Sequence, residues 1–112
     1  MKRFSKSSAP LEKQIQDSIC EYLATKKHFF YRQNNIPAFD RNTGKRWNMP
    51  KWGKNGAPDI VVVLKGKYLG LEVKRPTTGQ NEAQKVFEKE LTEAGGEYYV
   101  VRSIEDVQKL GL

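Results

Sequence analysis

The chain has 112 residues and carries 20 Lys and Arg side chains against 13 Asp and Glu, a formal net charge of +7 at pH 7. With 38% hydrophobic residues, a chain of this length can bury enough apolar surface to fold as one globular domain without covalent cross-links. Its 1 Cys and 1 His exclude a disulfide framework, a zinc finger and C-x-x-C redox chemistry. No apolar run is long enough for a membrane span or a secretory signal, so we expect an intracellular, cytoplasmic protein.

The positive charge is concentrated in two segments. Residues 1–8 have a net charge of +3 and residues 40–56 a net charge of +4, while basic and acidic side chains balance over the rest of the chain. We therefore expect a flexible basic tail over residues 1–9 and a single domain over 10–112 that carries a long basic loop at 34–57. Such segregation indicates a polyanionic partner. The alternative is a pair of solvated segments with no binding role.

The first half of the chain predicts one helix and one strand. Apolar residues recur at spacings of three and four from Pro10 to about Thr25, which indicates an amphipathic helix. The short aromatic run at 29–32 is typical of a strand. Residues 34–57 contain several Pro, Gly and Asn and no sustained period. A loop of this length in a small domain tends to be functional.

The second half predicts a hairpin followed by a helix, a strand and a short helix. Two β runs at 59–64 and 68–74 surround a Gly-containing turn, which indicates an antiparallel hairpin. An apolar stripe over 80–94 predicts a helix, and 97–102 predicts a strand that rejoins the sheet parallel to the second hairpin strand. Residues 103–110 begin with capping-box spacing. The elements give an α/β fold, a mixed sheet flanked by helices in the order α-β-β-β-α-β-α.

Charged residues are predicted to meet at one end of the hairpin. Asp59 opens the first hairpin strand, and Glu72 and Lys74 end the second. Because side chains alternate along a strand, Glu72 and Lys74 share one face, and the hairpin brings Asp59 beside them. The strands between these positions are almost wholly apolar, so charges there indicate a site.

Two facing carboxylates and a lysine fit metal-assisted phosphodiester chemistry. Carboxylates repel each other, and a hard cation such as Mg²⁺ relieves the repulsion while keeping several waters. The cation can polarise a phosphoryl oxygen, acidify a bound water and offset charge on the phosphorane. Lys74 can orient or deprotonate the attacking water and contact the scissile phosphate. The alternative is an exposed salt bridge of Lys74 with Asp59 or Glu72, which contributes little energy.

These residues resemble a known nuclease signature. Pro58-Asp59 followed by Glu72-Val73-Lys74 resembles the PD-(D/E)xK motif. The wider pattern resembles the VRR-NUC (virus-type replication-repair nuclease) domain, in a stand-alone phage-type form acting inside a host cell. That pattern comprises Glu12, Gly56–Asp59, Gly70–Arg75, Gln84 with Phe87, Ala94–Gly96 and Tyr98–Arg102. The resemblance runs from about Leu11 to Val107 and implies a restriction-endonuclease-like core.

The resemblance also implies a set of site residues. The implied metal ligands are Asp59, Glu72, Glu12 and the main-chain carbonyl of Val73, the catalytic lysine is Lys74, and the glutamine lining the site is Gln84. The two outer residues have alternative explanations. Glu12 lies near a helix N-terminus, where the helix dipole favours an acid without any catalytic role. Gln84 lies in an apolar stripe and needs hydrogen-bond partners, which either an active site or solvent at the helix edge supplies.

The implied activity is structure-specific cleavage of DNA. VRR-NUC proteins are Mg²⁺- or Mn²⁺-dependent nucleases, and the stand-alone members are similar to homodimeric Holliday-junction resolvases. Two sites related by a two-fold axis can nick two opposing strands of a four-way junction. Two alternatives remain open: a flap or single-strand nuclease that uses the same site, and a catalytically silent DNA-binding module.

Basic side chains around this site are candidate phosphate contacts, which give affinity without sequence preference. We predict this role for Arg75, Lys51, Lys54, Lys45, Arg46 and Arg32. Trp47 and Trp52 lie among these bases and can either stack on exposed nucleobases or anchor the loop to the core.

Overall fold

The computed structural model describes residues 11–33 and 52–112. The basic tail and most of the basic loop therefore lie outside the described residues. The elements are α1 (Glu12–Thr25), β1 (Phe29–Arg32), β2 (Ile60–Leu64), β3 (Lys67–Val73), α2 (Glu82–Glu93), β4 (Glu97–Val101) and α3 (Ile104–Lys109). This order confirms the predicted α/β architecture.

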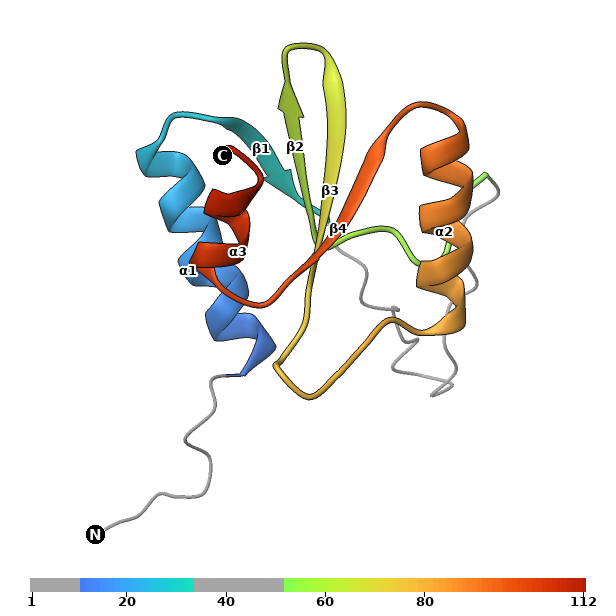
Figure 1. The fold of residues 1–112 in the computed structure, drawn as a ribbon, viewed down its shortest axis with the longest axis horizontal. Helices are drawn as coiled ribbons and strands as arrows, with labels where there is room; N and C mark the ends of the chain where they lie inside the picture. Colours follow the sequence, from blue (N-terminus) through green and yellow to red (C-terminus); the bar gives the residue numbers. More distant parts are fainter. Residues whose placement is uncertain (1–10, 34–51) are drawn as a thin grey trace, which may run out of the picture.

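One four-stranded sheet in the order β1-β2-β3-β4 forms the centre of the fold (Figure 1). β1 pairs antiparallel with β2, and β2 pairs antiparallel with β3 across the predicted hairpin. β4 lies parallel to β3, as the helix between them predicts. Within the hairpin, Ile60 lies opposite Leu71 and Leu64 opposite Lys67. This register puts the start of β2 beside the end of β3.

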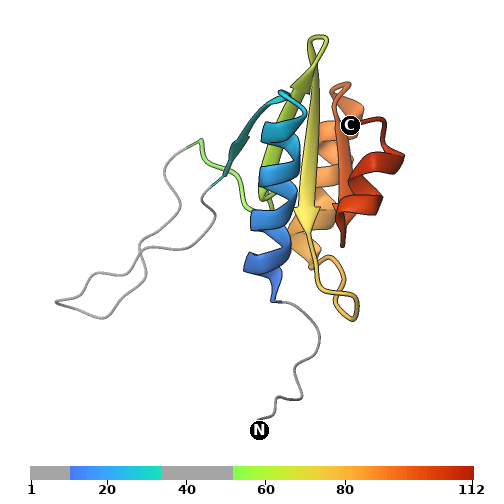
Figure 2. The ribbon, with the colours of Figure 1, turned by 90° about the vertical axis from the view of Figure 1, so that its left-hand side faces the viewer.

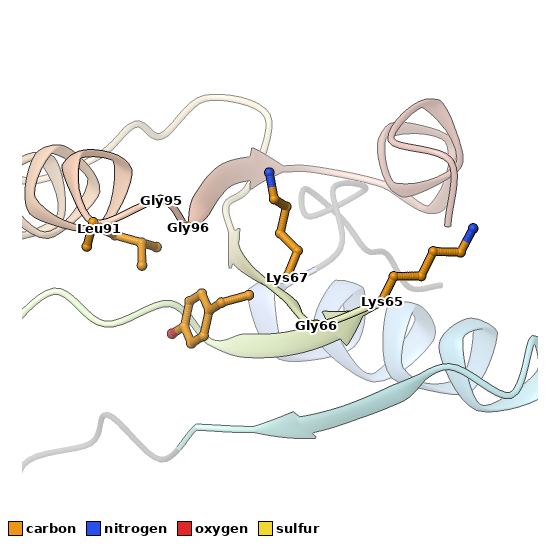
Figure 3. A pocket seen from close by; sticks show the side chains of 8 residues that line it. Lys65, Gly66, Lys67, Leu91, Gly95 and Gly96 are labelled. Atoms are coloured by element: carbon orange, nitrogen blue, oxygen red, sulfur yellow. The ribbon is translucent and has the colours of Figure 1, made fainter.

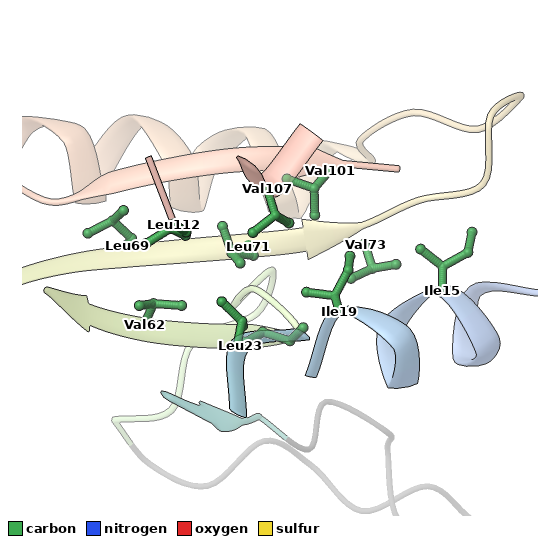
Figure 4. Packing of buried hydrophobic residues seen from close by; sticks show 11 residues of the cluster. Ile15, Ile19, Leu23, Val62, Leu69, Leu71, Val73, Val101, Val107 and Leu112 are labelled. Carbon is green, nitrogen blue, oxygen red and sulfur yellow. The ribbon is translucent and has the colours of Figure 1, made fainter. Parts of the chain in front are cut away.

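Helices lie on both sides of the sheet. In Figure 2, α1 lies in front of the sheet and α2 behind it, while α3 packs beside α1. The face under α1 and α3 is the core face, where apolar side chains of alternate strand positions meet the helices (Figure 4). The buried cluster comprises Ile15, Ile19, Leu23, Ile60, Val62, Leu69, Leu71, Val73, Val101, Val107 and Leu112. The opposite face, which we call the α2 face, therefore receives the remaining strand positions, including that of Glu72.

The helix and strand ends differ from the predicted ones by one or two residues, and side-chain caps explain two of the differences. α2 begins at Glu82 rather than residue 80 because Asn81 caps it: the Gln84 N–H donates to Asn81 Oδ1 at 2.9 Å. β4 ends at Val101 rather than residue 102 because the Arg102 N–H donates to Asp106 Oδ2 at 2.9 Å and leaves the ladder.

Other boundaries shift by a single position. β2 begins at Ile60 rather than residue 59, β3 runs one residue earlier than predicted at both ends, and Leu110 is the C-cap of α3 rather than part of it. α1 begins at Glu12, and Pro10 lies outside the described residues. None of the helices in 11–33 and 52–112 is long and apolar enough to cross a membrane.

Candidate active site

Asp59 and Glu72 meet at the end of the hairpin. The pairing of Ile60 with Leu71 makes Asp59 and Glu72 the next opposite positions along the two strands. Asp59 Oδ2 accepts a hydrogen bond from the Val73 N–H at 2.9 Å, and the Asp59 carbonyl accepts one from the Gln33 N–H at 2.7 Å. Together these bonds hold the main chain and the carboxylate of Asp59 at the end of the hairpin, where the sequence predicted them.

Glu72 is buried, with 3% of its surface exposed. Its Oε2 accepts a hydrogen bond from Gln84 Nε2 at 2.8 Å, which brings the predicted glutamine of α2 to the carboxylate. Lys74 Nζ lies 3.7 Å from the same oxygen, and the Lys74 side chain is itself only 12% exposed. Asp59, Glu72, Lys74 and Gln84 therefore form one cluster on the α2 face.

The buried Glu72 carboxylate and the neighbouring Asp59 carboxylate repel each other. Burial, and then the charge of Asp59, raise the pKa of Glu72 to about 8, against the opposing effect of the Lys74 ammonium. A hydrogen bond between the two carboxyl groups adds to the rise, because only a protonated carboxyl can donate it. At neutral pH the Asp59 and Glu72 pair therefore keeps one proton, which a divalent cation bound between the two groups would displace.

Tyr98 is a site residue that the sequence analysis missed. It is 5% exposed, and its hydroxyl lies 3.4 Å from Glu72 Oε1 and 3.4 Å from the Gly56 carbonyl oxygen. Burial, and then the neighbouring Glu72, raise the pKa of the Tyr98 hydroxyl, which therefore stays protonated and donates. Its ring packs on Phe87 of α2, with the ring centroids 5.9 Å apart. The alternation of side chains along β4 puts Tyr98 on the α2 face. Its contact with Glu72 also depends on the register of β4 against β3, which the sequence alone does not determine.

Two glycines bring the Asp59 segment close to the other site elements. Gly56 has φ +84°, and a Cβ there would lie 2.2 Å from the Ala83 carbonyl oxygen, in the first turn of α2. At Gly70 a Cβ would lie 2.6 Å from Cγ of Pro58, so the proline ring occupies the space that a side chain would need. The Pro58-Asp59 segment therefore rests on both β3 and the helix that carries Gln84.

Comparison with solved structures identifies the fold. A chain described as a VRR_NUC domain aligns with a TM-score of 0.62 and 23% identity, covering 88% of this chain and 91% of its own length. A chain described as a VRR_NUC domain protein aligns with a TM-score of 0.67 and 16% identity, covering 92% of this chain and 86% of its own length. The chain has the VRR_NUC fold. Neither a family model nor a curated protein matches the sequence.

Within the VRR_NUC fold, the predicted outer ligand Glu12 lies half-buried in the first turn of α1 and makes no hydrogen bond with Asp59 or Glu72. The described ranges contain no group of three or more His, Cys, Asp or Glu side chains placed to hold a metal ion. Val73, whose carbonyl is the other predicted ligand, ends β3 beside Asp59. The ligand roles of Glu12 and Val73 stay predictions.

The predicted phosphate contacts are only partly described in this VRR_NUC fold. Arg75 follows Lys74, and its Nε is buried with no hydrogen-bond partner among the described residues. Lys54 pairs with Glu90 at 3.1 Å and Arg32 with Asp17 at 3.5 Å, both on exposed surface where such pairs are weak. Trp52 is 89% exposed. Outside the described residues lie Lys45, Arg46, Trp47 and Lys51.

Because Gly56 lies in close contact with α2, we expect its substitution to destabilise the fold. Gly56→Ala is expected to lower the free energy of unfolding by roughly 2–5 kcal/mol, since it combines a left-handed backbone with a clash against main-chain atoms. Gly79→Ala is the matched control, because a Cβ at Gly79 has no heavy atom within 4 Å. Urea unfolding of both variants measures the difference, and equal midpoints would contradict the role assigned to Gly56.

Proposed function

We propose that this chain is a metal-dependent, structure-specific endodeoxyribonuclease that hydrolyses phosphodiester bonds in branched DNA, with Holliday-junction resolution as its main activity. The observation that carries the proposal is the buried cluster of Asp59, Glu72, Lys74 and Gln84 at the end of an apolar hairpin. The Lys74–Glu72 pair is 12% and 4% exposed, which argues against an exposed salt bridge of minor energy. The VRR_NUC fold adds support.

The donor set fits a hard divalent cation. Two carboxylates face each other, and burial together with the charge of Asp59 raises the pKa of Glu72 against the effect of Lys74, the only cation paired with it among the described residues. We assign Asp59 and Glu72 as ligands, with the Val73 carbonyl and Glu12 as further ones. Bound there, Mg²⁺ or Mn²⁺ supplies a polarised phosphoryl oxygen, an acidified water and compensation for phosphorane charge.

The surrounding side chains fix the two carboxylates in position. The Val73 N–H holds Asp59 Oδ2, Gln84 holds Glu72 Oε2, and the Tyr98 hydroxyl lies at Glu72 Oε1. Groups that are already oriented need no reorganisation during the reaction. Lys74 lies beside Glu72 on the same face, where its ammonium can orient the attacking water and contact the scissile phosphate. The water attacks phosphorus, and the P–O bond to the leaving strand breaks in one step without a covalent intermediate.

The substrate is DNA held through its phosphates. Arg75 follows Lys74 directly, and Lys54 and Arg32 are exposed. We propose that these three act together with Lys45, Arg46 and Lys51 of the basic loop. A homodimer with two-fold symmetry would present two such sites to two opposing strands of a four-way junction.

Cleavage of a labelled four-way junction tests this proposal, with linear duplex, flap and single strand of the same sequence alongside, in Mg²⁺ and in EDTA. We expect paired symmetric nicks in the junction, and none in EDTA. Cutting mainly of flaps or single strands would support the assigned active site but contradict the four-way junction as the main substrate. Binding without metal-dependent cutting of any substrate would instead indicate a silent DNA-binding module.

A further inference from the structure

Exposed aromatic side chains lie on the β1–β2 part of the α2 face. Among the described residues, α2 packs against β4 rather than β1 or β2, and Val61, on the same part of the face, is 1% exposed. Exposed there are Phe29 at 68%, Tyr31 at 46% and Val63 at 36%. The register aligns Phe29 with Val63 and Val63 with Tyr68, which puts these side chains on one face with Tyr68. We call Phe29, Tyr31, Val63 and Tyr68 the aromatic face.

The aromatic face lies on the same side of the sheet as the carboxylate cluster. Tyr68 and Glu72 are four residues apart on β3 and therefore point to the same side of the sheet. Tyr31 lies opposite Val61, two residues from Asp59, or about 7 Å along the strand. Burial, and then the neighbouring Tyr31 hydroxyl, raise the pKa of Tyr68.

A cavity lies at the end of this face that is far from the carboxylates. It has a volume of about 400 Å³ and lies between the hairpin turn and the C-terminal end of α2, with Tyr68 in its wall. Figure 3 shows Lys65 and Lys67 projecting from the turn that borders it, with Gly95 and Gly96 on the other side. Lys67 pairs with Glu97 at 3.0 Å, whereas Lys65 makes no ion pair within the described ranges. The far end of the face is therefore cationic.

We propose that the aromatic face binds unpaired nucleotides of the substrate strand, with bases stacked on Tyr31, Phe29 and Tyr68 on the side of the sheet that carries the carboxylate cluster and a phosphate near Lys65. Aromatic rings stack on any base, and a cation at the end of the path holds the backbone. The inference rests on the proposed nuclease function and names its substrate class. That class is DNA with unpaired nucleotides next to the cut, as at the crossover of a splayed four-way junction.

A nucleic acid explains this surface better than a second copy of the chain does. Lys65, which makes no ion pair within the described ranges, puts a cation at the end of the face and favours a polyanion. The aromatic face has four side chains, whereas a stable protein interface uses about 20–30 residues on each side.

Binding measured in EDTA tests the inference without cleavage. Fluorescence anisotropy with a labelled thymidine 20-mer and a labelled duplex compares the unchanged chain with a Phe29→Ala/Tyr31→Ala double variant. We expect the double variant to bind the single strand about 30-fold more weakly, with duplex affinity changed less than about twofold. Tyr31→Phe, which keeps the ring, should bind as the unchanged chain does. Val86→Ala, a 54% exposed apolar position on α2, is the matched control.

Circular dichroism and the single variant Tyr31→Ala check that weaker binding reflects the surface rather than unfolding. Unchanged single-strand affinity in a folded double variant would overturn the inference. Conversion of a dimer to a monomer by light scattering, at unchanged single-strand affinity, would also overturn it and assign the face to a second copy. This binding measurement needs no metal. If the double variant binds the single strand more weakly but the unchanged chain cuts no DNA, the proposed function would be contradicted and the inference about the aromatic face would stand.

Discussion

Lys74→Ala is expected to reduce the single-turnover rate of DNA cleavage by at least about 100-fold while leaving DNA affinity within about twofold. The Lys74 ammonium lies 3.7 Å from Glu72 Oε2 in a largely buried position, and it is the only cation paired with Glu72 among the described residues. No other side chain in those ranges can take its place. Rates measured at saturating protein separate the chemical step from binding.

Lys85→Ala is the matched control for this experiment. Lys85 lies on α2, its side chain is 57% exposed, and it pairs only with Glu82 at 3.6 Å among the described residues. It therefore removes the same charge without touching the cluster, and we expect unchanged cleavage. Thermal unfolding of both variants checks that each remains folded. Full activity in folded Lys74→Ala protein would refute the catalytic role of Lys74.

The part of the site that lies within one hairpin could be predicted from the sequence. Asp59 and Glu72 meet because an antiparallel hairpin with a short turn fixes its own register, and the alternation of β3 then puts Lys74 beside Glu72. The hydrogen bond from Gln84 to Glu72 could be predicted only in part. A glutamine in an apolar stripe needs hydrogen-bond partners, but the stripe does not distinguish the site from solvent, and only the structure identifies Glu72 as the partner.

Contacts between distant elements could not be predicted in this way. Tyr98 reaches Glu72 only through the parallel pairing of β4 with β3, whose register depends on the length and tilt of α2. The position of Glu12 relative to the cluster depends on how α1 packs against the sheet, which periodicity does not determine. The close contact of Gly56 with Ala83 likewise joins a loop to a helix that follows much later in the chain.

Glu72 is expected to make the metal-free protein less stable as the pH rises. Its pKa is about 8 in the folded protein against an ordinary value of 4.5, so between these two values the folded state binds more protons than the unfolded state. The free energy of unfolding should therefore fall from about pH 4.5 to about pH 8 and level off above, with a Glu72 contribution on the order of 4 kcal/mol. Urea unfolding in EDTA across this range measures the slope.

Glu72→Gln should flatten this slope, because a neutral amide of similar shape cannot ionise beside Asp59. At pH 8 in EDTA the variant should be more stable than the unchanged chain, and Mg²⁺ should raise the melting temperature of the unchanged chain but not of the variant. Glu93→Gln, at a 65% exposed position on α2, should keep both the slope and the response to Mg²⁺. An identical slope in Glu72→Gln would contradict the strained carboxylate pair. A carboxylate that weakens the metal-free fold contributes nothing to its stability, which supports the proposal that Glu72 is placed to bind a cation.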